Sequence, residues 1–426
     1  MILYDILFII FSIFAFPFLL FKGKLHRGYL ERLGFIDKGK ICESSIWLHA
    51  VSVGEVLSSK ELIRLLKVKF PDKRIVITTI TQTGNKVAKD IAGEDTIVSY
   101  LPLDVSFIIK NFIKRFNPYI FIGLETEIWP NLIFELERQS IPKVILNGRI
   151  SNSSFKKYNF FRLLLKPILR KVDYFAMQSD EYAARIINLG APIEKIEVSG
   201  NMKFDAQATD EDASDPQVTR TKLHLKPGED LFVAGCTHQG EEEIILSVYR
   251  NLSSLSHDLR LLIAPRHVER VSVIENLIRE QGFRALRISQ LGGQAIGRGD
   301  IYLLDTIGSL KTYYAVCSLA FVGGSLVAAG GHNILEPAYF AKPIIFGKHM
   351  DNFSDIKDLF LKNKAAIEVE DAIELQDKII EILKDSSMAK NLSIKAAQLV
   401  NSNMGTTKRN IAILNKVLGA YGKLSL

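Results

Sequence analysis

The chain has 426 residues and a formal net charge of +7, with 47% hydrophobic and 24% charged residues. This length is too great for one ordinary hydrophobic core and predicts two soluble domains. The three cysteines, Cys42, Cys236 and Cys317, are widely separated, and the eight histidines show no metal-ligand spacing. The composition therefore excludes a disulfide framework and argues against a structural zinc site.

The positive charge is concentrated in the first half of the chain. Residues 1–203 carry a net charge of +9, whereas residues 204–426 carry −2. A basic half behind an apolar N-terminus suggests contact with an anionic membrane surface or a phosphorylated partner. Nucleic acid is the alternative partner, but no recognisable nucleic-acid-binding motif accompanies the charge, so we expect no nucleic acid.

The N-terminus is apolar from Met1 to Phe21 except for Asp5, and basic residues follow it. A cleaved signal peptide carries its positive charges before the apolar run, so this segment is not one. The sixteen uncharged residues from Ile6 to Phe21 would form a helix of about 24 Å. That length is marginal for a membrane span and also fits a helix lying in the interface. We therefore expect residues 1–22 to be a membrane anchor, and the basic flank places the rest of the chain in the cytoplasm.

From residue 46 onward, near-continuous apolar runs alternate with amphipathic stretches. The runs predict strands near residues 46–53, 74–81, 96–103, 119–125, 143–149, 174–179 and 196–201. The stretch 54–70 predicts a helix with one apolar face. This alternation indicates a parallel sheet covered by helices on both faces.

A break in this pattern divides the chain. Residues 204–218 are acidic and small, contain proline, and have no apolar period, which favours a linker. Apolar runs then predict strands near residues 231–236, 259–266, 300–306, 318–324 and 342–347, before a largely helical region from Asp371. We expect one doubly wound domain over 23–205, a second over 206–405, a helical tail over 406–426, and a ligand cleft at the carboxyl ends of the strands.

Polar residues follow several strands of the first domain. Glu55 lies at the first strand-to-helix turn, where a carboxylate can act as a general base or can merely favour the helix dipole. Glu125 and Glu127 end another strand beside Trp129, a set that could bind sugar hydroxyls or form a hydrogen-bonded turn. Lys203 precedes the linker, and its location is all that separates it from a surface lysine.

The stretch FVGGSLVAAGGHNILEPA, residues 321–338, is the most distinctive of the second domain. It joins a strand predicted from Tyr313 to Val322 to a helix that Asn333 can cap. Paired glycines allow close backbone approach, and a helix N-terminus attracts anions, so the stretch suits a phosphate. The alternative is a plain strand–turn–helix junction with Glu336 closing a capping box on Asn333. Neither the dinucleotide nor the nucleoside-triphosphate fingerprint is present.

Two further strand ends complete the candidate set of the second domain. APRH, residues 264–267, places Arg266 after a strand, and a forked guanidinium suits a phosphate or a carboxylate. DTIGS, residues 305–309, forms another strand-end turn.

These motifs together resemble the 3-deoxy-D-manno-oct-2-ulosonic acid (Kdo) transferases of lipid A biosynthesis. The matching segments are HAVSVGE, TTITQTG, YLPLD, ETEIWPN, NGRIS, SGNMKFD, THQGEE, APRH, DTIG and FVGGSLVAAGGHNILEP, in family order from residue 49 onward. The resemblance implies a GT-B glycosyltransferase with two Rossmann-like domains facing a central cleft. It implies transfer of Kdo from CMP-Kdo to a lipid A precursor at the cytoplasmic face of the inner membrane. We expect no cofactor and no metal ion, because a leaving group with one phosphodiester could be neutralised by the helix N-terminus at Asn333 with Arg266 and Lys203.

Residue roles are carried over from this resemblance. Glu55 matches the catalytic base, while Glu125 and Lys203 match positions that stabilise the transition state. The CMP-binding segments match, in chain order, Pro265 and Arg266, then Ile307, Gly308 and Ser309, then Asn333, Ile334, Leu335 and Glu336. Ser309 departs from the family pattern, since an acidic residue is common there.

Three other functions stay open on the sequence. One is a different membrane-associated GT-B transferase that uses a UDP-sugar and a lipid-linked acceptor. The second is a non-catalytic nucleotide-binding or membrane scaffold protein, and the third is a GT-B epimerase. The number and linkage of transferred Kdo residues are not encoded by these motifs.

Overall fold

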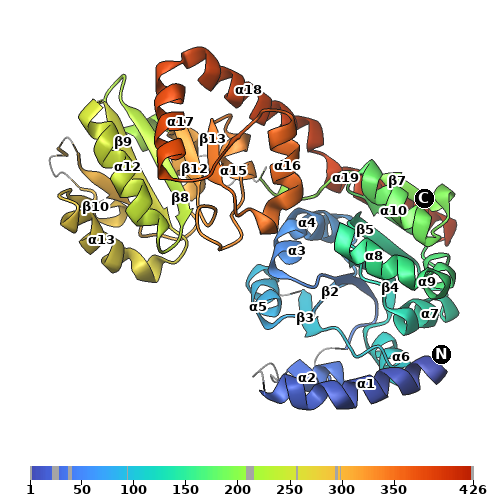
Figure 1. Cartoon of the computed structure of the whole chain (residues 1–426). Coiled ribbons are helices and arrows are strands. Elements are labelled where there is room, and N and C mark those ends of the chain that lie inside the picture. Colours follow the sequence, from blue (N-terminus) through green and yellow to red (C-terminus); the bar gives the residue numbers. More distant parts are fainter. Residues whose placement is uncertain are drawn as a thin grey trace. The chain divides into compact units, whose positions relative to one another are not determined.

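The structure is a computed structural model that describes residues 2–21, 28–36, 41–93, 95–207, 215–255, 258–292, 296–297 and 299–423. The chain separates into an N-terminal unit, residues 1–206 with 403–426, and a C-terminal unit, residues 207–402. Each unit is built on a seven-stranded parallel sheet with helices against its faces (Figure 1). Two doubly wound α/β folds were predicted, and this architecture is confirmed.

The sheet of the N-terminal unit has the strand order β3-β2-β1-β4-β5-β6-β7. Its strands are β1 Ser45–His49, β2 Arg74–Thr79, β3 Thr96–Tyr100, β4 Pro118–Leu124, β5 Lys143–Gly148, β6 Tyr174–Met177 and β7 Ile196–Val198. Its helices are α1 Ile2–Phe21, α2 Gly28–Arg32, α3 Val53–Ser58, α4 Lys60–Lys69, α5 Gln82–Ile91, α6 Ser106–Phe116, α7 Pro130–Arg138, α8 Asn152–Phe160, α9 Arg162–Leu169, α10 Asp180–Leu189 and α19 Thr406–Ala420.

The sheet of the C-terminal unit has the order β10-β11-β9-β8-β12-β13-β14. Its strands are β8 Asp230–Thr237, β9 Leu259–Pro265, β10 Ala285–Arg287, β11 Ile301–Leu303, β12 Leu319–Val322, β13 Ile344–Gly347 and β14 Ile367–Val369. Its helices are α11 Pro216–Lys222, α12 Glu241–Leu255, α13 Val271–Glu280, α14 Leu310–Val316, α15 Leu335–Tyr339, α16 Ser354–Lys362, α17 Ala372–Lys384 and most of α18 Ser386–Asn403.

The central strands of the first sheet are apolar and buried, so the sheet packs on both faces. In β1, Ile46 and Leu48 pack against α4, α5 and α19 on one face. Trp47 points to the other face and packs against α6 and α7. Successive side chains of a strand alternate between faces, so a continuous apolar run is what a sheet covered on both sides requires.

The C-terminal helix α19 belongs to the N-terminal unit. Ile413, Leu414 and Leu418 of α19 lie in the same core as β1 and α4. The carboxylate of Asp205 accepts the backbone N–H groups of Gly405, at 2.7 Å, and of Thr407 at the start of this helix. The predicted helical tail is therefore packed, with α4 and α5, in the core on one face of the first sheet.

The N-terminal helix α1 is attached to the same unit through its one acidic residue. The Asp5 carboxylate accepts the backbone N–H of Ser106 at 3.0 Å and the side-chain amide of Asn131 at 2.7 Å. Asp5 thus caps α6, which has no cap from its own preceding residue. Along the residues that the structure describes, no helix is long and apolar enough to cross a membrane.

Some local predictions differ from the structure. The run Tyr313 to Val322 was predicted as one strand, but its first four residues end α14 and only Leu319–Val322 form β12. The helix predicted over 54–70 is two helices, α3 and α4, that meet at Ser59. Of the predicted linker over 204–218, residues 208–214 lie outside the described residues, while α11 begins at Pro216.

Candidate active site

The strand order brings the acidic candidates of the N-terminal unit together. β1 and β4 are neighbours, and the chain proceeds from them toward opposite edges of the sheet. The carboxyl ends of two such strands leave a crevice where ligands bind in open α/β sheets. Glu55 follows β1, and Glu125 and Glu127 follow β4. All three line one cavity of about 300 Å³, together with Thr126, Arg149, Ser151, Ser154 and Tyr158.

Glu55 is held by hydrogen bonds to the N-cap Ser52 and to the residue before it at the start of α3. Its carboxylate accepts the backbone N–H of Val51 at 2.8 Å and the hydroxyl of Ser52 at 2.9 Å. Ser52 in turn accepts the backbone N–H of Glu55. The reciprocal bonds with Ser52 satisfy the Glu55 N–H in the first turn and, with the bond from Val51, fix the Glu55 side chain.

The turn before Glu55 is fixed by the motif TTITQTG. Thr81 donates its hydroxyl to the Val51 carbonyl at 3.2 Å and caps α5 by accepting the N–H of Gly84. A side chain at position 84 would approach the Val51 carbonyl to 3.3 Å and Thr81 Oγ1 to 2.7 Å. Glycine at this position therefore lets α5 pack against the turn that carries Glu55.

The environment of Glu55 shifts its acidity toward neutrality. Burial, followed by the nearby charge of Glu125, raises the pKa of Glu55 to about 7, although the hydrogen bonds from Val51 and Ser52 act in the opposite direction. Burial and Glu125 likewise raise the pKa of Glu127 to about 6. A carboxylate with a pKa near the working pH is suited to general-base chemistry.

The backbone at the end of β4 is in an unusual conformation. Glu125 has a φ of 56°, in the left-handed region that non-glycine residues seldom adopt. Its N–H still donates to the Leu146 carbonyl of β5 at 3.0 Å. Such a conformation costs about 1–3 kcal/mol, and its place beside a cavity of polar residues points to a functional role.

Lys203 lies on a turn that a polar network holds. Asn147, also at a positive φ of 56°, accepts the N–H of Met202 at 2.9 Å. Lys203 itself donates its backbone N–H to the Asn201 side chain at 3.0 Å, and its side chain is half-buried. Arg409 of α19 donates to the Ser199 carbonyl at 2.8 Å, so α19 also supports this turn.

Two of the candidate nucleotide-binding segments of the C-terminal unit follow β9 and β12. Pro265 ends β9 and is buried, whereas Arg266 is exposed and donates its N–H to the Thr237 carbonyl at 3.0 Å. Asn333 Oδ1 accepts the N–H of Leu335 at 3.1 Å, and Asn333 Nδ2 donates to Glu336 at 3.3 Å. The helix was predicted to be capped by Asn333, but its N-cap residue is Ile334, and Asn333 binds the first turn from one residue earlier. Ile334 and Leu335 are buried, so they support the loop.

The third candidate nucleotide-binding segment, residues 307–309, is a solvent-exposed turn. Ile307 is 85% exposed. Gly308 has a φ of +89°, and a side chain added at this position would meet no other atom within 4 Å. Ser309 precedes α14 and shares a hydrogen bond of 2.8 Å with Thr306, without capping that helix through its side chain.

Three histidines that the sequence did not mark as site residues lie close together near the glycine-rich loop. The Nε2 atoms of His238 and His332 are 2.8 Å apart, and the ring of His267 meets that of His238 edge to face at 5.9 Å. Burial and the charge of Arg266 lower the pKa of His332 to about 4. A side chain at Gly324 would come within 3.0 Å of the His332 ring. The sequence could not show that these histidines meet, because each follows a different strand and the order of the strands in the sheet is not visible in the sequence.

The glycine-rich loop itself is fixed by Glu241 at the start of α12. The Glu241 carboxylate accepts four backbone N–H groups, those of His238, Gly324, Ser325 and Leu326, at 2.6–2.9 Å. A side chain at Gly323 would lie 2.6 Å from the Cys236 carbonyl oxygen. Close backbone approach is therefore the reason for glycine at this position.

Comparison with known proteins identifies the family. The sequence profile described as "3-Deoxy-D-manno-octulosonic-acid transferase (kdotransferase)" matches residues 27–206. The 3-deoxy-D-manno-octulosonic acid transferase of Haemophilus influenzae is 35% identical over 392 residues, which cover 91% of each chain. The chain belongs to the Kdo transferase family. It is therefore an enzyme, a glycosyltransferase, and the family predicted from the motifs is confirmed.

Further matches agree in family and in fold. The 3-deoxy-D-manno-octulosonic acid transferase of Chlamydophila psittaci is 32% identical over 370 residues, covering 84% of each chain. A putative UDP-N-acetylglucosamine 2-epimerase of Listeria monocytogenes superposes with a TM-score of 0.57 at 13% identity, covering 89% of this chain and 97% of its own. A glycosyltransferase of Rickettsia africae gives a TM-score of 0.53 at 17% identity, with 88% and 99% coverage. These two structures show the fold only.

The described residues were also compared with the requirements of a metal site. Among the described residues, no group of three or more His, Cys, Asp or Glu side chains is arranged to hold a metal ion.

Proposed function

We propose that this family member transfers Kdo from CMP-Kdo to a sugar hydroxyl of a lipid A precursor such as lipid IVA. The observation that carries the proposal is the position of Glu55, a buried carboxylate with a pKa raised to about 7 at the wall of a polar cavity. Family membership supplies the Kdo chemistry. The alternatives of a scaffold protein and of an epimerase lose their basis with that membership.

In the proposed step, Glu55 accepts the proton of the acceptor hydroxyl as its oxygen attacks the anomeric carbon of Kdo. The bond between that carbon and the phosphate oxygen breaks, and CMP leaves with the electron pair. One base and no covalent intermediate are needed, which gives inversion. Each oxygen of Glu55 accepts one hydrogen bond, from Val51 or Ser52, and so retains a lone pair for the proton.

The neighbouring polar groups are assigned to binding and charge stabilisation. Glu125 and Lys203 keep the transition-state roles implied by the family motifs. Arg266 and the loop from Asn333 to Glu336 would hold CMP, whose single phosphodiester needs less neutralisation than a pyrophosphate. The turn Ile307, Gly308 and Ser309 would complete the nucleotide contact. Under this proposal the transfer proceeds without a divalent metal.

We also propose that α1 lies in the cytoplasmic interface of the inner membrane. Ile6, Leu7, Ile13 and Phe14 are each at least half exposed, while Asp5 ties the helix to α6 and α7. A helix with one docked side and one apolar exposed side fits an interfacial position.

The decisive experiment is incubation of the purified chain with CMP-Kdo and detergent-dispersed lipid IVA, with product masses read by mass spectrometry. Products heavier by one or more Kdo residues support the proposal, and their masses give the number transferred. Binding of UDP in preference to CMP, with no Kdo product, would instead favour a UDP-sugar transferase.

A further inference from the structure

We propose that the turn between α8 and α9 inserts into an anionic lipid bilayer and forms a second membrane contact beside α1. Phe160 and Phe161 make this turn, and their rings meet edge to face with centroids 4.9 Å apart. The proposal does not depend on the transfer reaction, because it concerns a surface that no proposed catalytic group shares.

The turn carries the largest run of exposed apolar side chains in the described body of the N-terminal unit. Phe160 is 83% exposed, Phe161 51%, Leu163 87% and Leu164 68%. Scattered exposed apolar residues are normal, but four within five consecutive positions form a contiguous patch. An aromatic and leucine-rich tip is the composition of segments that enter the headgroup and acyl boundary of a bilayer.

Charge complementarity selects an anionic bilayer as the occupant. Residues 151–171 hold six basic residues and no acidic one. Three of the six are Arg162 and Lys166 of α9 and its C-cap residue Arg170, which follow one another four residues apart. They line a surface hollow of about 620 Å³ with Lys195. Glu194 is the single acidic residue of that hollow. Each basic residue near an anionic leaflet adds about a fivefold factor in binding.

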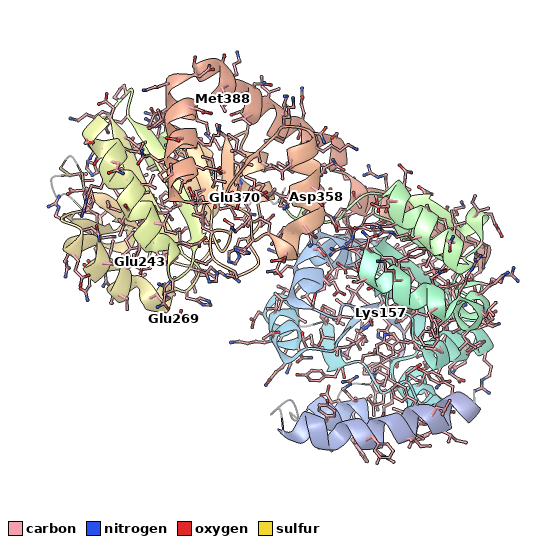
Figure 2. The ribbon with its side chains drawn as sticks, in the orientation of Figure 1. Lys157, Glu243, Glu269, Asp358, Glu370 and Met388 are labelled. Atoms are coloured by element: carbon pink, nitrogen blue, oxygen red, sulfur yellow. The ribbon has the colours of Figure 1, made fainter. Side chains whose placement is uncertain are left out.

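The position of the turn agrees with the proposed place of α1. Asn131 at the start of α7 binds Asp5 of α1, and Ile133 in the same helix packs in one core with Ile168 and Leu169 of α9. α1 and α9 are thus attached to the same helical layer through α7. Lys157 lies on α8, on the approach to the turn (Figure 2).

The inner side of α8 faces the acidic cavity. Ser151, at the cap of α8, and Ser154 and Tyr158 within it line that cavity. One short helix therefore connects the cavity wall to the exposed tip. A bilayer at the tip would lie next to the cavity where we place the acceptor sugar, so a lipid-bearing acceptor could reach it without leaving the membrane.

A local fluorescence measurement tests the proposal on the full chain. The sequence has two tryptophans, and Trp47 is fully buried. Phe160→Trp adds a reporter at the tip, and Val68→Trp adds one at a position of α4 that is 71% exposed on the opposite face of the sheet. With phosphatidylglycerol-containing vesicles carrying spin-labelled lipid, we expect a blue shift and quenching at position 160 and neither at position 68. Quenching at neither position, in a chain that still sediments with vesicles, would overturn the proposal.

Substitutions at the tip test its contribution to binding. R162Q/L163S removes one cation and one apolar side chain, and V68S/K69Q is the matched control on α4. We expect the partition coefficient onto phosphatidylglycerol-containing vesicles to fall at least about tenfold for the first variant and to stay near wild type for the second. Binding should weaken with salt and on pure phosphatidylcholine. Equal vesicle binding by both variants contradicts the proposal. If the wild-type chain is a dimer, and R162Q/L163S makes it monomeric without changing vesicle binding, the exposed turn contacts a second copy of the chain and not a bilayer.

Discussion

Replacing Glu55 by glutamine should separate catalysis from folding in this enzyme. Glutamine keeps the length of the side chain and its reach to Val51 and Ser52, but it cannot accept the proton of the acceptor hydroxyl. General-base catalysis contributes about 10² to 10⁴ in rate, so single-turnover transfer should fall by that factor. CMP affinity should stay within about threefold, because the proposed nucleotide contacts belong to the C-terminal unit.

The same substitution should stabilise the protein above neutral pH. The native state raises the pKa of Glu55 from 4.5 to about 7, chiefly through burial. The native chain therefore binds this proton more tightly than the unfolded chain, and the free energy of unfolding decreases as the pH rises between these two values. The loss is roughly 3 kcal/mol once both states are ionised. Glutamine has no charge to bury, so Glu55→Gln should recover about 1–2 kcal/mol, or roughly 2–8 °C in melting temperature.

The pH dependence of the rate gives an independent readout. The wild-type rate should rise with pH up to about 7 and then level, because only the ionised carboxylate accepts a proton. The glutamine variant should show no such rise. A carboxylate that merely favours the helix dipole predicts near-normal turnover and a stability loss of about 0.3–1 kcal/mol.

Glu135→Gln is the matched control for this experiment. Glu135 is 4% exposed, lies on α7 and binds Arg138 at 2.7 Å. Its substitution also removes a buried carboxylate from the N-terminal unit, yet we expect the transfer rate and its pH profile to remain those of the wild type. Single-turnover transfer, CMP affinity and melting temperature should be measured on all three proteins. Near-wild-type turnover and an unchanged pH profile for Glu55→Gln would refute the assignment of Glu55 as the base.

Three other predictions concern contacts away from Glu55. Asp5→Ala removes the cap of α6 and should lower the free energy of unfolding by about 1 kcal/mol, while transfer to detergent-dispersed acceptor is retained. An unchanged melting temperature would mean that α1 is not docked through Asp5. Arg266→Ala removes a charged donor and should weaken CMP binding about tenfold or more by calorimetry, and equal affinity would remove Arg266 from the nucleotide site. A chelator should leave the initial transfer rate at its control value when CMP-Kdo is supplied preformed, whereas loss of the rate with recovery on adding magnesium would rule out a metal-free step.

Much of the fold follows from local patterns in the sequence. Most of the buried strands are apolar along their length, so their β/α repeats could be recognised one by one, whereas the three-residue edge strands β10 and β14 were not predicted. The first ambiguity was the apolar run from Tyr313 to Val322, where a buried helix and a buried strand have the same composition. Tyr314 is fully buried, and its hydroxyl lies where a side chain at Gly235 would stand. That helix is fixed by tertiary packing, which local composition does not reveal.

The candidate site was predictable where it depends on strand ends and not where it depends on pairing between strands. Glu55 and Glu125 could each be placed at a strand-to-helix turn, but their meeting in one cavity requires β1 and β4 to be neighbours. The same holds for His238, His267 and His332, which come from three different strand ends. Asp5 gave a visible signal as the one charge in an apolar run, and its role as the cap of α6 appears only once α1 is docked.

Each unit has a glutamate in the first turn of the helix that follows its first strand, and the two glutamates differ in their hydrogen bonds. In each, the first strand of the sheet is followed by a helix whose first turn holds a glutamate, Glu55 in α3 and Glu241 in α12. Glu241 accepts four backbone N–H groups, which uses the hydrogen-bonding capacity of both oxygens and locks the glycine-rich loop. Glu55 accepts two hydrogen bonds and has the carboxylate of Glu125 nearby instead of further donors. At Glu55, burial and the charge of Glu125 raise the pKa, and the two hydrogen bonds from Val51 and Ser52 offset only part of that rise. The same position in the fold therefore yields a structural glutamate in one unit and the proposed catalytic base in the other.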